Sequence, residues 1–384
     1  MWKPDGSVDA ITYLGKPLSE VVGTAFRSLQ LGPLGIILGA EQTDLILGLL
    51  DSIACLPSSE MRRKIFVADK IFENLVFEMQ PPNPKVQSIF WRAVLDCVWQ
   101  WEDSHEKVHK GTAYYFMAKS YLGLGDIPSA YICFFNALED DKMNLPHIPK
   151  NFKDAPAYCT TSLVCNPNNA LFPSVVVPLR ALLQNFVQEY NSKVGRSITL
   201  LTLDQKFLQA DPLEDIKRFF VATIHEIYHL APLNSTRMIN NDYSELKIID
   251  TLFNLGLVID QTLEHRFLKS APKNQKMMGN AVYQLALHLG WAKQKENKDA
   301  REFLNKAKPH PNAGSPDQVL PDYLDGSATY ASKPMEYLMR AVFAAYHLRN
   351  YGGHHLEGSD ILVNRYNDVL QMVMDAFFVS VESL

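Results

Sequence analysis

Apolar residues recur along most of this chain three to four positions apart, the spacing of amphipathic helices, whereas strand-like alternation is rare. In the clearest case, residues 243–267, one face carries Leu246, Ile249, Leu252, Phe253, Ile259 and Leu263. Gly256 falls on the same face, so we expect a neighbouring helix to approach closely there. Strand-like runs are few and short, and the best are at 174–177 and 198–203. The pattern predicts an all-α protein.

The C-terminal part of the chain predicts a helical bundle. After 243–267, further amphipathic segments occupy 275–293, 334–350 and 360–383, with a loop rich in proline and glycine at 309–334. Pro334 suits the first turn of its helix, and Ser359 suits the N-cap of the last one. We expect these helices to bury their apolar faces against one another in a four- or five-helix bundle spanning 241–384.

The N-terminal part, residues 1–145, is also helical and contains one more specific pattern. Between Thr112 and Asp141, large and small residues resemble a tetratricopeptide repeat in their spacing: Tyr114, Met117, Ala118, Tyr121, Gly125, Ala130, Phe134 and Ala137. One repeat cannot bury its own face. We therefore expect an atypical, tetratricopeptide-like helical layer, which could recognise a protein partner.

Residues 146–240 lie between these parts and predict an irregular connector followed by helices. Prolines are frequent at first, and helical patterns resume at 177–189 and 213–230. Pro232 is expected to end the second of these helices and to mark the boundary with the bundle.

Composition favours a soluble globular protein, with 47% hydrophobic and 21% charged residues. The net charge of −5 argues against a general nucleic-acid coat, which would carry a basic excess. The segment 266–308 is a local exception, with ten Lys or Arg against three acids.

The five cysteines are widely scattered, which excludes a disulfide framework and a paired CxxC metal site. The chain shows no secretory leader, and its longest apolar run is too short to span a membrane. These features predict a cytoplasmic protein.

The most promising site for chemistry follows the helix predicted at 334–350. Arg349 and Asn350 precede His354 and His355, and Gly352-Gly353 break the helix between them. An arginine can hold a phosphate by two charge-assisted hydrogen bonds, and a histidine can move a proton near neutral pH. Two other pairs with a similar separation, Arg218–His225 and Arg340–His347, lie inside single predicted helices, where nothing opens a cleft.

This arrangement resembles the HEPN family of ribonucleases, whose motif is an arginine, a polar residue and a histidine after four to six intervening residues. The resemblance covers about residues 243–384. It implies metal-independent RNA cleavage by attack of the ribose 2′-OH, with a 2′,3′-cyclic phosphate product. It also implies a site shared across a homodimer, no cofactor, and a possible role as a defence or toxin effector.

Under this resemblance, Arg349 would stabilise the scissile phosphate, and His354 would act as general acid or base. His355 satisfies the same spacing, so either histidine could act. Asn350 would orient the histidine or the phosphate. Residues 334–384 contain three Arg and no Lys against six acids. We therefore expect RNA to be attracted by the basic segment through Lys269, Lys273, Lys276, Lys293, Lys295 and Lys298, with stacking on Tyr283 and Trp291.

A competing site is the HExxH pattern His225-Glu226-Ile227-Tyr228-His229. Two histidines four positions apart on one helix can share a zinc ion, and the glutamate can activate bound water. A zinc hydrolase also needs a third ligand, for which Glu245, Asp250 and Glu264 are candidates. The alternative function is therefore a zinc metalloprotease centred on His225 and His229.

A third hypothesis is a non-catalytic helical scaffold that binds RNA or protein, in which the Arg349 pair merely caps two helices. A ribonuclease of the HEPN type should work in EDTA, a zinc enzyme should lose activity in chelator, and a scaffold should cleave nothing.

Overall fold

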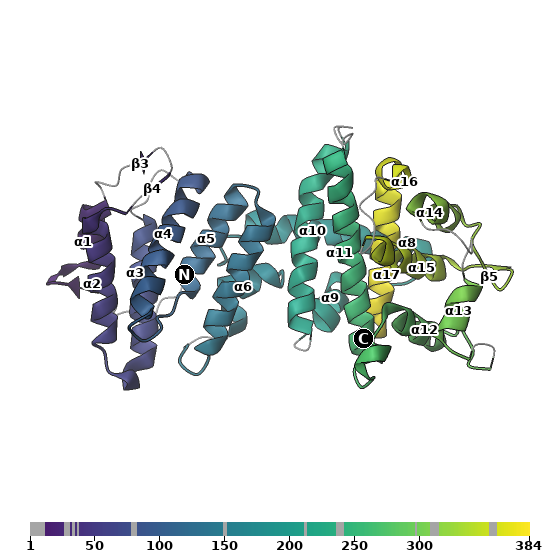
Figure 1. Cartoon of the computed structure of the whole chain (residues 1–384), viewed down its shortest axis with the longest axis horizontal. Helices are drawn as coiled ribbons and strands as arrows, with labels where there is room; N and C mark the ends of the chain where they lie inside the picture. The colour runs from purple at the N-terminus through teal and green to yellow at the C-terminus, as the bar shows by residue number, and fades with distance from the viewer. Residues whose placement is uncertain are drawn as a thin grey trace. The chain divides into compact units, whose positions relative to one another are not determined.

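The computed structural model describes residues 12–26, 31–32, 35–36, 38–77, 83–148, 152–210, 213–235, 242–295, 298–307, 315–352 and 359–384. Within these ranges the chain forms seventeen α-helices and three minimal two-stranded hairpins. The all-α prediction is confirmed. The helices divide into two compact units, Met1–Pro173 and Ser174–Leu384 (Figure 1).

The first unit contains seven α-helices: α1 (Leu18–Phe26), α2 (Ala40–Ala54), α3 (Met61–Phe77), α4 (Pro84–Glu102), α5 (Gly111–Gly123), α6 (Ile127–Met143) and α7 (Pro156–Thr161). Short 3₁₀ turns are η1 (Ser58–Glu60) and η2 (Phe152–Asp154), and the hairpins are β1 (Thr12–Tyr13) with β2 (Lys16–Pro17) and β3 (Leu31–Gly32) with β4 (Gly35–Ile36). The local sequence sets several helix starts. Asn83 caps α4 and Asp126 caps α6, each with a proline in the following first turn.

Helices α5 and α6 form a hairpin at the segment that carries the repeat-like spacing. Ala118, Ala130 and Phe134 are fully buried between the helices. Gly125 takes a left-handed conformation in the turn, with φ of 74°, where a side chain would be strained. The small residues thus allow the two helices to pack closely.

The second unit contains ten α-helices: α8 (Val177–Val194), α9 (Leu200–Leu203), α10 (Glu214–Ser235), α11 (Asp242–Phe267), α12 (Met278–His288), α13 (Ala300–Lys306), α14 (Pro316–Asp325), α15 (Tyr337–Gly352), α16 (Asp360–Asn364) and α17 (Tyr366–Ser383). It also contains two π-helical turns, η3 (Phe172–Val176) and η4 (Asp204–Leu208), and one 3₁₀ turn, η6 (Lys273–Gln275). Strand β5 (Thr329–Tyr330) pairs with β6 (Lys333–Pro334).

Helix α11 is central in this unit, because α10, α12, α15 and α17 all pack against it (Figure 1). Helix α17 is buried along most of its length and also contacts α8 and α15. Its apolar residues fill the core on several sides rather than along one stripe, as expected for a helix surrounded by others. The helix predicted at 243–267 is confirmed almost to the residue.

Several sequence expectations for this unit are wrong in detail. Pro334 lies in β6, and α15 begins only at Tyr337. Pro232 does not end its helix, because α10 continues through it to Ser235. The strand-like runs at 174–177 and 198–203 are helical for most of their residues. Packing against neighbouring helices overrides the local preferences of these short segments.

The region between α13 and α15 differs from the predicted loop, because it contains α14. The last predicted helix is broken at Arg365, whose φ of −122° is not helical, and so divides into α16 and α17. Ser359 is the N-cap of α16, as predicted, but its side chain does not cap the helix. Instead, Asp317 of α14 accepts hydrogen bonds from the backbone N–H of Ile361 (2.8 Å) and from the Ser359 hydroxyl (3.1 Å).

None of the helices within the described ranges combines the length and the apolar character that a bilayer crossing requires.

Candidate functional site

Arg349 lies in the last turn of α15 and forms an ion pair with a buried carboxylate. Its Nη2 is 3.1 Å from Oδ2 of Asp260 on α11, and the Asp260 side chain is only 6% exposed. About a third of the Arg349 side chain, 34%, is exposed. The guanidinium is thus paired with a buried group, while part of the Arg349 side chain remains exposed.

The two helices approach closely where this ion pair forms. An added Cβ on Gly256 of α11 would lie 2.8 Å from Arg349 Cβ and 3.3 Å from its Cα. Only glycine therefore fits at this crossing. The prediction that Gly256 admits a neighbouring helix is confirmed, and the neighbour is the helix that carries Arg349.

Two features of the surroundings of Asp260 act on its pKa in opposite directions. Burial raises the pKa of Asp260, the Arg349 guanidinium lowers it, and burial is the larger effect. A buried carboxylate without its cation would be costly. Arg349 therefore contributes to the stability of the bundle as well as to any chemistry.

Asn350 lies next to this ion pair. Its Oδ1 accepts a hydrogen bond from Arg349 Nη1 at 3.3 Å, so the asparagine contacts the guanidinium rather than an unrelated group. The Arg349 Nε is enclosed, and it has no hydrogen-bond partner in the described part of the chain. His354 and His355, the expected proton-transfer residues, lie outside the described residues.

The two histidines of the HExxH pattern lie on one face of α10, as their spacing predicts. Their ring centroids are 5.1 Å apart. His225 is buried, and burial, together with the neighbouring His229, lowers the pKa of His225 to about 4. A neutral imidazole at neutral pH is the form that binds metal.

Glu226 and the proposed third ligands do not complete this site. Burial raises the pKa of Glu226, with opposing effects from Lys247 and Asp250 of α11. Asp250 forms an ion pair with Lys247 at 3.8 Å, and Glu264 forms one with Lys276 at 3.3 Å. Among the residues that the structure describes, no three His, Cys, Asp or Glu side chains are grouped to hold a metal ion. The side chain of Glu245 lies outside the described residues.

The basic segment presents most of its predicted RNA-binding residues to solvent. Exposed lysines are Lys269, Lys273, Lys293, Lys295 and Lys298, whereas Lys276 is partly buried and forms an ion pair with Glu264. Tyr283 is not available for base stacking, because it is buried and packs on Phe303 at a centroid distance of 5.5 Å. Its position on the inner face of α12 overturns that expectation. Trp291 is partly exposed.

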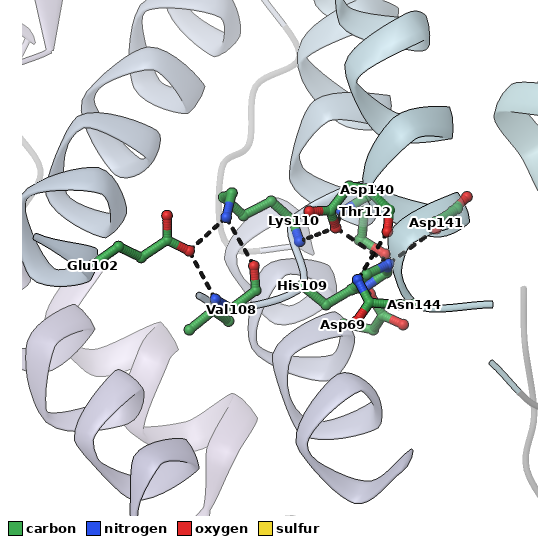
Figure 2. A network of polar contacts seen from close by, with 10 residues as sticks. Asp69, Glu102, Val108, His109, Lys110, Thr112, Asp140, Asp141 and Asn144 are labelled. Atoms are coloured by element: carbon green, nitrogen blue, oxygen red, sulfur yellow. Dashed lines mark hydrogen bonds and ion pairs between the residues drawn. The ribbon is translucent and has the colours of Figure 1, made fainter. Parts of the chain in front are cut away.

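The first unit contains a polar cluster that sequence reasoning missed (Figure 2). His109, 5% exposed, lies between three carboxylates. Its Nδ1 is 3.0 Å from Asp69 Oδ1, and its Nε2 is 2.9 Å from Asp141 Oδ1 and 3.4 Å from Asp140 Oδ2. Burial opposes the charge on His109, but the carboxylates together raise the pKa of His109 well above its usual value.

The same cluster links the end of α6 to the start of α5. Asp140 near the end of α6 accepts hydrogen bonds from the backbone N–H groups of Lys110 and Gly111 at the start of α5, at 2.7 Å and 3.0 Å (Figure 2). Asp69 also accepts from Thr112 at 2.8 Å. Both ring nitrogens of His109 are therefore occupied, and the cluster ties α3, α5 and α6 together. In the sequence, only the adjacent pair Asp140-Asp141 hints at this cluster, because the partners lie some 30 to 40 residues apart.

Comparison of the chain with protein-family models, with curated proteins and with solved structures found no match.

Proposed function

We propose that this protein is a metal-independent endoribonuclease of the HEPN type, with Arg349, Asn350 and one of His354 and His355 as its catalytic residues. The observation that carries the proposal is the partly exposed side chain of Arg349, whose guanidinium is held at the end of α15 by a buried carboxylate. The Asn350 amide lies beside it, and two histidines follow within six residues. A fixed, charged donor near groups that can move protons is the minimum that RNA cleavage needs.

The reaction follows from these groups. One histidine takes the proton from the ribose 2′-OH as the 2′ oxygen forms a bond to phosphorus. The bond from phosphorus to the 5′ oxygen breaks, and that oxygen receives a proton from a second histidine, supplied by the partner of a homodimer. Arg349 stabilises the extra negative charge on the phosphoryl oxygens. The products are a 2′,3′-cyclic phosphate and a 5′-hydroxyl.

RNA would reach this site through the exposed lysines of the basic segment, which supply the positive charge that residues 334–384 lack. The α5–α6 hairpin and its neighbours would form a tetratricopeptide-like surface for a protein partner. A cytoplasmic location agrees with the five cysteines, all of them described and all free thiols. A defence or toxin role is the biological setting that this activity suggests.

A zinc metalloprotease at His225 and His229 remains a second candidate function, favoured by the close approach of the two rings on one helix face. Zinc held there would activate a bound water, with Glu226 as the base. This candidate lacks a third protein ligand among the described residues.

The decisive experiment measures RNA cleavage by the full chain in excess EDTA. The parent, the double variant His354→Ala with His355→Ala, and His229→Ala are compared. We expect cleavage by the parent and by His229→Ala, and none by the double variant. Activity that EDTA abolishes, or that the double variant retains, would contradict the proposal. Arg349→Ala is a poor first test, because it leaves Asp260 buried without its cation.

A further inference from the structure

We propose that Asp260 is a positioning residue for RNA cleavage, which fixes the guanidinium of Arg349 in the orientation that receives the scissile phosphate. This inference rests on the proposed ribonuclease function and adds to it a residue from α11, about ninety positions before the Arg349 motif.

The contact between Asp260 and Arg349 joins two elements at a fixed point. Asp260 Oδ2 lies 3.1 Å from Arg349 Nη2, and the carboxylate is almost completely buried. Gly256 is one helical turn earlier on the same face of α11, where the two backbones approach. The tight crossing at Gly256 therefore holds the part of α11 that carries Asp260 against α15.

The planar shape of the guanidinium lets a contact on one side orient the whole group. Arginine has five N–H donors in a planar fork, so a bond at one edge orients the other donors. Asp260 engages Nη2, Asn350 engages Nη1, and Nε is enclosed. Each of Nη1 and Nη2 carries a second N–H that these contacts do not use, and 34% of the side chain is exposed, so these two donors are oriented before RNA arrives. Prior orientation of a binding group lowers the entropy lost when the transition state forms.

Because Asp260 is buried, its carboxylate interacts with Arg349 and not with solvent. A surface carboxylate could turn away and release the arginine, whereas a buried one stays in place because leaving its cation would be costly. The other acid nearby on α11, Glu264, is instead paired with Lys276. Asp260 thus acts through Arg349 and does not contact RNA itself.

The test compares Asp260→Asn and Asp260→Glu with a matched control, Asp375→Asn. Asp375 is another fully buried carboxylate of the same unit, bonded to Tyr337 and Gln371 and not to Arg349. We expect Asp260→Asn to lower kcat about 10- to 100-fold with little change in KM, because orientation at the reacting phosphate is lost. Asp260→Glu should recover part of the lost rate, since it keeps the carboxylate, and Asp375→Asn should cleave as the parent does.

Thermal unfolding shows which variants are folded. If Asp260→Glu does not fold, the contrast between Asp260→Asn and Asp375→Asn decides. Parent-like cleavage by Asp260→Asn, an equal loss in Asp375→Asn, or a folded Asp260→Glu no better than Asp260→Asn would each overturn the positioning role. In those cases, cleavage lost in the His354→Ala, His355→Ala variant would still support the ribonuclease. A parent chain that cleaves no RNA overturns both.

Discussion

At the scale of single residues, the two units each depend on buried charged groups whose partners are distant in sequence. His109 is the clearest case, because its imidazolium neutralises part of the charge of three surrounding carboxylates. Helical periodicity does not reveal such pairs. It predicts which face of a helix is buried but not which polar residue meets which across a helix interface.

Replacement of His109 should destabilise the first unit. In His109→Gln, the buried carboxylates lose their cation, and we expect a loss of about 3–5 kcal/mol. Urea unfolding followed by tryptophan fluorescence measures it well, because four of the five tryptophans precede residue 174. The exposed His147 provides the control, and His147→Gln should change stability by less than about 0.5 kcal/mol. Equal losses of stability in the two variants would show that buried His109 contributes no more to folding than an exposed histidine.

The pH dependence of the same unfolding has a definite sign. The folded state raises the pKa of His109, so its stabilisation is complete below the usual value of 6.5 and is lost as pH rises through the higher folded pKa. The free energy of unfolding of the parent should therefore fall with rising pH above 6.5. In His109→Gln this decline should be much weaker. A decline of the same slope in both proteins would assign it to other groups.

Asp375 gives the second unit a pH dependence of its own. Burial raises its pKa to about 6 from 3.8, against the opposing hydrogen bonds from Tyr337 and Gln371. Its contribution to stability is thus greatest below pH 3.8 and falls by about 3 kcal/mol as pH rises through 6. Asp375→Asn should remove that fall. Unfolding of parent and variant, followed by circular dichroism at pH 4 and pH 7, should give a smaller difference for the variant; equal differences would be inconsistent with this pKa.

Sequence alone identified some of these residues and not others. Gly256 was recognised because a glycine on an apolar helix face has few other reasons to be there. The histidines of α10 share a face simply because of their four-residue spacing. Asp260 was missed, because nothing local distinguishes a carboxylate that pairs with Arg349 from one that faces solvent.

At the scale of elements, periodicity predicted the long helices well and the short ones poorly. Helix α11 matched its prediction because its apolar stripe is long. Helix α14 is not apparent from the sequence, because proline and glycine surround it and Pro321 lies inside it, a composition typical of a loop. The break at Arg365 has no proline or glycine to mark it.

Gly256→Ala tests the crossing of α11 and α15. Alanine at an open helical position normally stabilises a helix relative to glycine. Here the added methyl group meets Cβ and Cα of Arg349, and we expect a loss of about 1–3 kcal/mol instead. Thermal unfolding gives the sign directly. A gain in stability would show that the two helices can separate at no cost.

Asp317→Ala tests the contact between α14 and α16. The carboxylate caps the first turn of α16 from a distant element, so its removal should cost about 0.5–2 kcal/mol. Ser359→Ala removes only the hydroxyl contact and should cost less. Chemical denaturation of the two variants compares them, and a larger loss for Ser359→Ala would indicate that Ser359, not Asp317, provides the cap.

At the scale of the whole molecule, the chain consists of two helical units, and the proposed site needs a second copy of the chain. A site that requires motifs from both protomers responds to mixing in a specific way. We mix equal amounts of parent and the His354→Ala, His355→Ala variant and let the subunits exchange. Cleavage should fall to about a quarter of that of parent alone at the same total protein concentration, because only dimers of two parent chains act. Activity of about a half would indicate protomers that work independently. Sedimentation of the same mixture checks the oligomeric state.

The central claim, attack by a ribose 2′-OH with Arg349 at the phosphate, is tested most directly by the products of one defined oligonucleotide. The measurement is mass spectrometry of the products made by the full chain in EDTA, from all-ribose RNA and from the same RNA with a single 2′-O-methyl group at the cleaved position. We predict a 2′,3′-cyclic phosphate from the first RNA and no cleavage at the modified position in the second. A product with a 5′-phosphate, or cleavage that ignores the 2′-O-methyl group, would contradict the account.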